Sequence, residues 1–132
     1  MPLLALVIDD SMLIRHTVCR ILQKFGFAVE TATDGADALE VLKTIQPDVI
    51  FTDLQMPRFN GYELIEALKN NAETAGIPVL VLAARPLSGH APTTRAHSVI
   101  YKDLNLEDQL RQALESLFPS NATTSSSSSQ RE

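Results

Sequence analysis

The sequence predicts an α/β fold in which helices cover both faces of a parallel five-stranded sheet. Short apolar runs recur five times, and glycine, proline or polar residues bound each of them. The runs are nearly continuous rather than alternating, which is typical of strands buried on both faces. Segments with apolar residues at helical spacing separate most of the runs. This alternation favours a doubly wound sheet with right-handed crossovers.

The third apolar run ends at an acidic residue. The expected strands are residues 3–8, 27–32, 49–53, 78–82 and 98–101. Pro57 and Gly61 prevent the third strand from continuing, so Asp53 is its last residue. Ligands collect where the carboxyl ends of parallel strands open into a crevice, which makes Asp53 a candidate functional residue. The alternative is that Asp53 only caps a turn by accepting backbone N–H groups.

Helix start and stop signals separate the strands. Ser11 is a candidate N-cap of a first helix, and Gly26 is a candidate stop. Asp34 and Gly35 begin a second helix, and Pro47 closes that connection. A third helix follows the glycine at position 61 and carries an apolar stripe. No such pattern spans residues 85–97, which contain two prolines and a glycine, so the fourth helix is expected to be irregular or missing.

The last helix is expected to begin with a capping box, in which Asn105 is the cap and Asp108 replaces the usual Glu or Gln. Its apolar stripe consists of Leu106, Leu110, Ala113, Leu114 and Leu117, and Pro119 ends it. Residues 1–118 therefore form one predicted domain. Residues 119–132 include five consecutive serines and offer nothing to bury, which predicts a disordered tail.

Composition narrows the class of function. The net charge of −5 argues against direct nucleic-acid binding, which needs clustered Lys and Arg. There is no basic leader and no run of about 18 apolar residues, so neither export nor membrane insertion is predicted. Cys19 is the only cysteine, which excludes an internal disulfide and suits the cytoplasm.

Two further carboxylates, Asp9 and Asp10, follow the first strand. First and third strands lie side by side in sheets of this kind, so both should meet Asp53 at the carboxyl edge. Two like charges about 4 Å apart repel by roughly 4 kcal/mol at an effective dielectric near 20, so the trio needs a cation or raised pKa values. Mg²⁺ suits such a site and leaves a coordination position for a phosphoryl oxygen. Lys102, after the fifth strand, could add a positive charge.

These residues carry a resemblance. From residue 3 to residue 117 the chain resembles the receiver domains of bacterial two-component response regulators, which have the CheY-like fold of the flavodoxin type. The resemblance rests on Asp9-Asp10 after the first strand, on Asp53 within Thr-Asp-Leu-Gln-Met-Pro-Arg-Phe-Asn-Gly, and on Lys102 after the fifth strand. It implies the strand order 2-1-3-4-5.

The resemblance also implies roles. Asp53 would be the phosphoacceptor, served by a histidine kinase or a phosphotransfer protein. Asp10, Asp53 and the backbone carbonyl of Gln55 would bind Mg²⁺ directly, with Asp9 acting mainly through water. Lys102 would contact the phosphoryl group or the unmodified Asp53. Such a single-domain regulator assists its own phosphorylation and dephosphorylation without being a turnover enzyme, and signals by contact with a downstream protein.

Two positions depart from the receiver pattern. Ala83 ends the fourth strand, where receivers have a Thr or Ser whose hydroxyl reports phosphorylation, and a methyl group cannot bond a phosphoryl oxygen. Val99 replaces the partner aromatic residue, and Tyr101 lies two residues further on the same strand face. Weak coupling of Asp53 to the fourth and fifth strands is therefore expected.

Two alternatives stand beside the phosphorylated receiver. The first is a receiver-like adaptor whose binding ignores phosphorylation, which fits Ala83 and Val99 but not the complete set of acids and lysine. The second is a phosphohydrolase of the haloacid-dehalogenase type with Asp53 as nucleophile. Those enzymes use Asp-x-Asp, whereas Gln55 stands here in place of the second acid.

Overall fold

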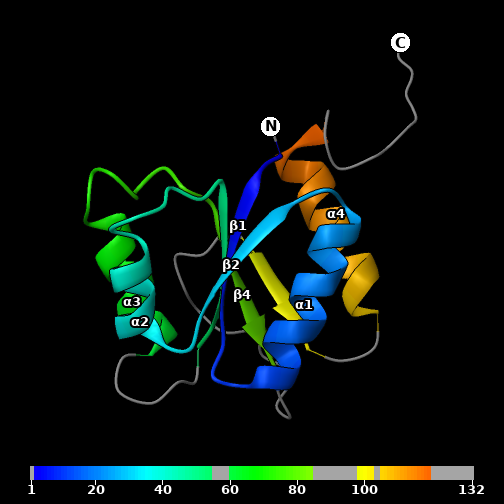
Figure 1. Cartoon of the computed structure of the whole chain (residues 1–132), viewed down its shortest axis with the longest axis horizontal. Helices are drawn as coiled ribbons and strands as arrows, with labels where there is room; N and C mark the ends of the chain where they lie inside the picture. Colours follow the sequence, from blue (N-terminus) through cyan, green and yellow to red (C-terminus); the bar gives the residue numbers. More distant parts are fainter. Residues whose placement is uncertain (1, 55–59, 85–97, 103–104, 120–132) are drawn as a thin grey trace.

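The computed structural model describes residues 2–54, 60–84, 98–102 and 105–119. Helices cover both faces of one sheet (Figure 1). The sheet has five strands in the order β2-β1-β3-β4-β5, and every adjacent pair is parallel. The predicted doubly wound α/β fold and the strand order 2-1-3-4-5 are therefore confirmed.

The strands lie within one residue of their predicted positions. They are β1 Leu4–Ile8, β2 Ala28–Ala32, β3 Val49–Asp53, β4 Val79–Ala83 and β5 Ser98–Tyr101. Every residue of β3 and β4 is buried, because each of these strands has a strand on either side and helices on both faces. This burial explains the continuous apolar runs in the sequence.

The described helices are α1 Met12–Lys24, α2 Gly35–Val41, α3 Gly61–Lys69 and α4 Leu106–Leu117. Ser11 caps α1 as predicted, since its hydroxyl accepts the Ile14 N–H at 3.3 Å. Gly26 follows α1 with φ at 92°, a left-handed conformation that glycine adopts without steric cost. Asn60 and Glu63 form a full capping box at α3.

The predicted capping box at the last helix is wrong. Asn105 adopts φ 72° and ψ 21°, and its side chain makes no capping hydrogen bond. An N-cap side chain reaches the helix amides from an extended backbone, whereas asparagine is one of the few residues that enter the left-handed region readily. The backbone carbonyl of Asn105 still accepts the Gln109 N–H at 2.9 Å.

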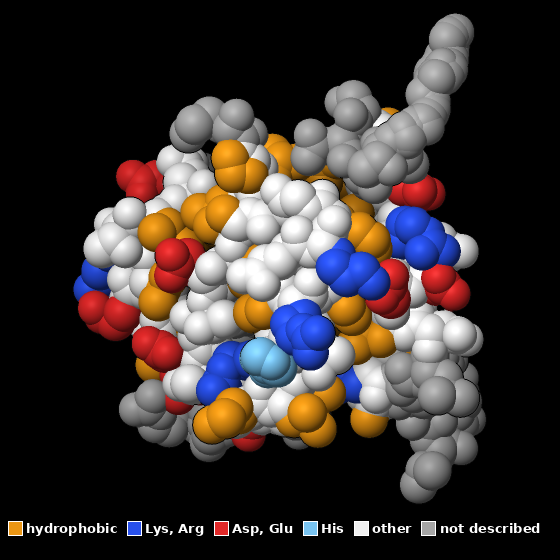
Figure 2. Space-filling model, turned by 45° about the vertical axis from the view of Figure 1, so that its right-hand side comes forward, with side chains coloured by type: hydrophobic (Ala, Val, Ile, Leu, Met, Phe, Trp, Pro, Cys, Tyr) orange, Lys and Arg blue, Asp and Glu red, His pale blue; other side chains and the backbone are white. Residues whose placement is uncertain are grey.

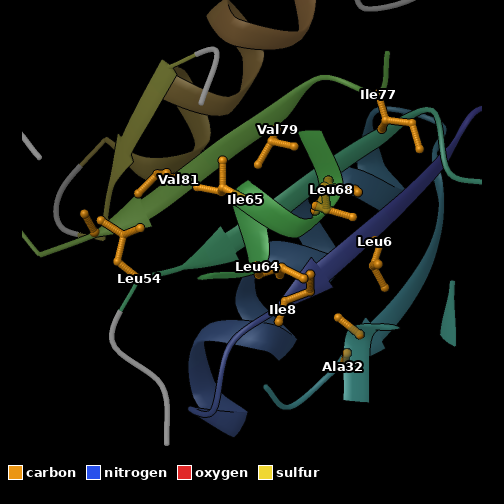
Figure 3. Close-up of a cluster of buried hydrophobic side chains, with 13 residues drawn as sticks. Leu6, Ile8, Ala32, Leu54, Leu64, Ile65, Leu68, Ile77, Val79 and Val81 are labelled. Atoms are coloured by element: carbon orange, nitrogen blue, oxygen red, sulfur yellow. The ribbon is translucent and has the colours of Figure 1, made fainter. Parts of the chain in front are cut away.

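Alternate residues of the central strands pack into two separate hydrophobic cores, one on each face of the sheet. Leu6 and Ile8 face α2 and α3, whereas Ala5 and Val7 face α1 and α4. Figure 3 shows the first core, with Leu64, Ile65 and Leu68 of α3 above the side chains of β1 and β4. Packing on both faces holds the strands rigid, so residues at their carboxyl ends have fixed positions.

Several sequence predictions fall outside the described residues. They concern the connection at 85–97, where an irregular or missing fourth helix is expected, the backbone carbonyl of Gln55, and the tail beyond Pro119. Among the helices that the structure does describe, none has the length and apolar character needed to cross a membrane.

Candidate functional site

Three carboxylates meet at the carboxyl edge of the sheet. One carboxylate oxygen each of Asp9, Asp10 and Asp53 lies within 4.8 Å of the others. The sheet order explains this convergence, because β1 and β3 are neighbours and end at the same level, with Ile8 opposite Thr52. The predicted acidic cluster is thus present in the fold.

The ammonium group of Lys102 lies among these acids. Its Nζ is 2.8 Å from Asp9 Oδ2 and 3.1 Å from Asp53 Oδ1. Lys102 follows β5, so its side chain crosses the carboxyl end of β4 to reach β1 and β3. Its side chain is only 17% exposed. The lysine therefore bridges Asp9, which follows β1, and Asp53, the last residue of β3.

Burial and ion pairing act in opposite directions on this lysine. Burial disfavours the charged ammonium, but the close carboxylate of Asp9, followed by that of Asp53, outweighs burial and raises the pKa of Lys102. The side chain consequently stays charged throughout the physiological range. It supplies a permanent positive charge at the phosphoacceptor candidate.

Asp9 is held by all four of its polar atoms. Its N–H donates to the Ala32 carbonyl at 3.2 Å, and its own carbonyl accepts from Arg15 Nη1 at 2.6 Å. Oδ1 accepts the Ser11 N–H at 2.8 Å. Oδ2 is fully buried and has the ion pair with Lys102 but no well-directed hydrogen bond. Asp9 is therefore fixed in position, with Oδ1 bonded to the backbone and Oδ2 directed at Lys102.

Arg15 is a site residue that sequence reasoning missed. Its position on α1 is that of an ordinary charged residue near the surface of a helix. No sequence motif predicts that its side chain bonds to the Asp9 carbonyl. The guanidinium ties α1 to the turn that carries Asp9 and Asp10. Asp10 itself is exposed and forms no hydrogen bond or ion pair within the described part of the chain.

The donor set fits a hard divalent cation. Carboxylate oxygens are the ligands that Mg²⁺ prefers, and Mg²⁺ retains several waters. The exposed Asp10 and the neighbouring Asp53 could both approach such an ion, and Asp9 Oδ2, which accepts no hydrogen bond from the described residues, could accept one from a water bound to the ion. Gln55 lies outside the described residues, so its expected carbonyl ligand is not placed.

Gly61 lies directly beneath the end of β3. A Cβ atom at this position would be 2.7 Å from Leu54 Cα and closer still to the Asp53 carbonyl oxygen. The Gly61 N–H donates to the Leu54 carbonyl at 3.0 Å. Only glycine lets the start of α3 approach Asp53 this closely.

The two positions that depart from the receiver pattern carry no polar side chain in the structure. Ala83 ends β4 and is 7% exposed, and Val99 packs against the same core cluster. The register of β4 and β5 pairs Ala83 with Tyr101 and Val81 with Val99. Tyr101, rather than Val99, is therefore the residue of β5 beside Ala83.

A parallel α/β sheet with three carboxylates and a lysine at its carboxyl edge defines the receiver class of signalling domains. Comparison of the chain with known protein families agrees, since the response regulator receiver domain matches residues 5–115. The chain belongs to this family of two-component signal transduction, as its resemblance implied.

Known proteins extend the comparison. Protein PilG of Pseudomonas aeruginosa is 42% identical over 80 residues, which are 61% of this chain and 59% of PilG. Response regulator MprA of Mycobacterium sp. (strain KMS) is 38% identical over 85 residues, 64% of this chain and 36% of MprA. The matched stretch thus spans less than two thirds of either relative. The structure of chemotaxis response regulator CheY4 of Vibrio cholerae is 29% identical, with a TM-score of 0.78, and the match covers 89% of this chain and 100% of CheY4.

Proposed function

We propose that this receiver accepts a phosphoryl group on Asp53 from a histidine kinase or a phosphotransfer protein, in a Mg²⁺-dependent reaction, and signals by contact with a downstream protein. The observation that carries the proposal is the convergence of Asp9, Asp10 and Asp53, two of which, Asp9 and Asp53, pair with the ammonium of Lys102. A site that only capped a turn would need neither the second acidic strand end nor the buried lysine.

The chemistry follows from these groups. An Asp53 carboxylate oxygen attacks the phosphorus atom of the donor, and the bond from phosphorus to the donor atom breaks as the new P–O bond forms. The transition state is loose and spreads negative charge over the equatorial oxygens of the phosphoryl group. Lys102 Nζ, already 3.1 Å from Asp53 Oδ1, is placed to bind one of these oxygens.

A bound Mg²⁺ ion would neutralise part of the charge on the phosphoryl oxygens. Asp10 and Asp53 would hold it directly, together with the Gln55 carbonyl. Asp9, whose backbone and Oδ1 are already bonded, would contribute through water. The protein provides this site for its own modification and is proposed to perform no turnover of an external substrate.

The surface beside the site supports a protein as the donor. Met12 and Leu13, in the first turn of α1, are 74% and 73% exposed. Large apolar side chains exposed next to a reactive group are typical of an interaction surface. Figure 2 shows Lys and Arg side chains gathered around a histidine on one face of the molecule, with hydrophobic side chains nearby. Arg20 and His16 of α1 are both exposed.

We place this exchange in the cytoplasm. Burial raises the pKa of the lone Cys19 thiol, and the nearby Arg15 offsets this only in part. The raised pKa keeps this thiol protonated and unreactive. The proposed compartment rests on the single cysteine of the sequence, which allows no internal disulfide.

The proposal is tested by incubating the protein with Mg²⁺ and acetyl phosphate and measuring its intact mass. The expected product carries one phosphoryl group, and Asp53→Asn should abolish the addition. Asp48→Asn is the matched control, because Asp48 lies at the opposite end of β3, where its carboxylate accepts the Leu4 N–H. Undiminished modification of Asp53→Asn, or of the wild type in excess chelator, would contradict the proposal.

A further inference from the structure

The side chain of Gln109 clamps the backbone of Tyr101. The Tyr101 N–H donates to Gln109 Oε1 at 2.9 Å, and Gln109 Nε2 donates to the Tyr101 carbonyl at 2.9 Å. Within the described sheet, β5 is an edge strand, and these two groups point away from its neighbour β4. The carboxamide occupies the place of a strand neighbour and fixes β5 to α4.

The clamp acts one residue away from the lysine of the site. Tyr101 directly precedes Lys102, whose own N–H donates to the Ala83 carbonyl at 2.9 Å. The end of β5 is therefore held on one side by β4 and on the other by α4. This double attachment fixes the backbone from which the Lys102 side chain reaches Asp9 and Asp53.

The other end of the clamp is equally firm. Leu110, the neighbour of Gln109, and Leu114, one turn later, are fully buried in the core beneath α4. Packed helices move as units rather than deforming residue by residue. A displacement of the Tyr101 backbone therefore acts on α4 as a whole.

Binding of a cation must disturb Lys102. The ammonium faces the same carboxylates of Asp9 and Asp53 that would attract a divalent ion. Two positive charges at one acidic cluster repel, so the lysine has to shift when the ion binds. Lys102 is joined covalently to Tyr101, and the shift is transmitted to the residue that Gln109 holds.

We propose that Gln109 positions Lys102 in the acidic site and that the same clamp makes α4 respond when a cation binds there. The inference rests on the cation site of the proposed function and adds a path from that site to the surface of α4. The path requires no hydroxyl at position 83. It therefore differs from the expectation, drawn from Ala83 and Val99, that the site couples only weakly to the fourth and fifth strands.

The test is a Mg²⁺ titration followed by backbone amide NMR, without any phosphodonor. In the wild type, the amides of Asp10 and Ser11 report the site, and those of Leu110 and Ala113 report α4. Both sets are expected to shift. Gln109→Ala should keep the shifts at the site and reduce those in α4 by about fivefold or more. A side chain that only stabilised the fold would leave this ratio unchanged.

Gln112→Ala is the matched control, since Gln112 is exposed on the next turn of α4, and it should behave as the wild type. Gln109→Glu decides the matter if the alanine variant does not fold. A glutamate can accept the Tyr101 N–H but cannot donate to its carbonyl, so the α4 shifts should again fall.

The outcomes separate the two proposals. Wild-type shifts at Asp10 and Ser11 with none in α4 would overturn the role of Gln109 and leave the cation site intact. Full α4 shifts in the folded Gln109→Ala or Gln109→Glu variant would overturn it as well. A wild type in which Mg²⁺ shifts no amide at all would overturn the cation site, and the inference with it.

Discussion

Lys102 Nζ lies 2.8 Å from Oδ2 of Asp9, a carboxylate with no exposed surface. The two residues come from opposite ends of the chain and meet only because β5 and β1 belong to one sheet. Asp9 gains a counter-charge that water cannot provide at this depth. The pair therefore links the stability of the fold to the electrostatics of the site.

Replacing Lys102 by Met should destabilise the protein in the presence of a chelator. The buried Asp9 and Asp53 would lose their cation, at a cost of about 1–3 kcal/mol in the free energy of unfolding. Added Mg²⁺ should restore much of this loss. Urea unfolding of both proteins, with and without Mg²⁺, measures the effect.

Lys43→Met is the control for that experiment. Lys43 pairs with Glu40 at 3.0 Å, but both side chains are about two thirds exposed or more. Exposed pairs contribute about 0–1 kcal/mol, so the control should change little. Equal losses for the two variants would show that the ion pairs of Lys102 add nothing beyond surface charge.

The stabilising effect of Lys102 should depend on pH in the alkaline range. Its pKa is raised in the folded state, so the contribution is fully present below the ordinary lysine pKa of about 10.4 and is lost as pH rises through the folded-state pKa. The difference in unfolding free energy between the wild type and Lys102→Met should be constant near neutrality and shrink above about pH 10.5. A difference that grew with pH would contradict the sign of this linkage.

Gly61→Ala should damage both fold and site. The new methyl group would collide with the backbone of Asp53 and Leu54, which costs about 1–3 kcal/mol when a packed region is overfilled. The displaced Asp53 should also bind Mg²⁺ more weakly, as calorimetry would record. Gly76→Ala is the matched control, because a Cβ there meets nothing within 4 Å. Equal stability and equal Mg²⁺ affinity of the two variants would contradict the close approach of Gly61 to the backbone of Asp53 and Leu54.

Arg15→Ala should weaken Mg²⁺ binding without unfolding the protein. The change removes the donor to the Asp9 carbonyl, and loss of such outer partners lowers metal affinity by about tenfold or more. Arg20→Ala removes the same charge from an exposed position of the same helix and should leave the Kd nearly unchanged. If both variants lost affinity equally, net charge rather than the tether would be responsible.

Leu13→Asp should distinguish phosphoryl transfer from a protein donor from transfer by a small-molecule donor. Leu13 is 73% exposed beside the site, so a charge there should impair transfer from a phosphorylated kinase while acetyl phosphate still modifies Asp53. Gln23→Asp adds the same charge at the far, exposed end of α1 and should preserve both reactions. A parallel loss of both reactions in Leu13→Asp would indicate damage to the acidic site itself.

Much of the fold and site was predictable because local patterns determined it. Continuous apolar runs specified β3 and β4, which are buried at every position. Acids at the ends of the first and third strands could be placed together from topology alone. Short periodic signals and strand ends are properties that a sequence displays directly.

The remaining features depend on tertiary geometry. Asparagine is a common N-cap residue, but the backbone of Asn105 is left-handed and its side chain makes no capping hydrogen bond. Arg15 and Gln109 bond to backbone groups, which every residue possesses, so no partner residue type signals these contacts. Such contacts become visible only once helices and strands are docked.

The position of Lys102 directly after the last strand has a consequence for folding on the ribosome. The strands β1 and β3 emerge long before β5, so the acids of Asp9 and Asp53 can come together while Lys102 is still unsynthesised. A nascent chain in this condition carries a repulsive acidic edge that Lys102 does not yet neutralise. Divalent cations should then act on the emerging chain as temporary substitutes for the lysine, hastening the docking of the first strands.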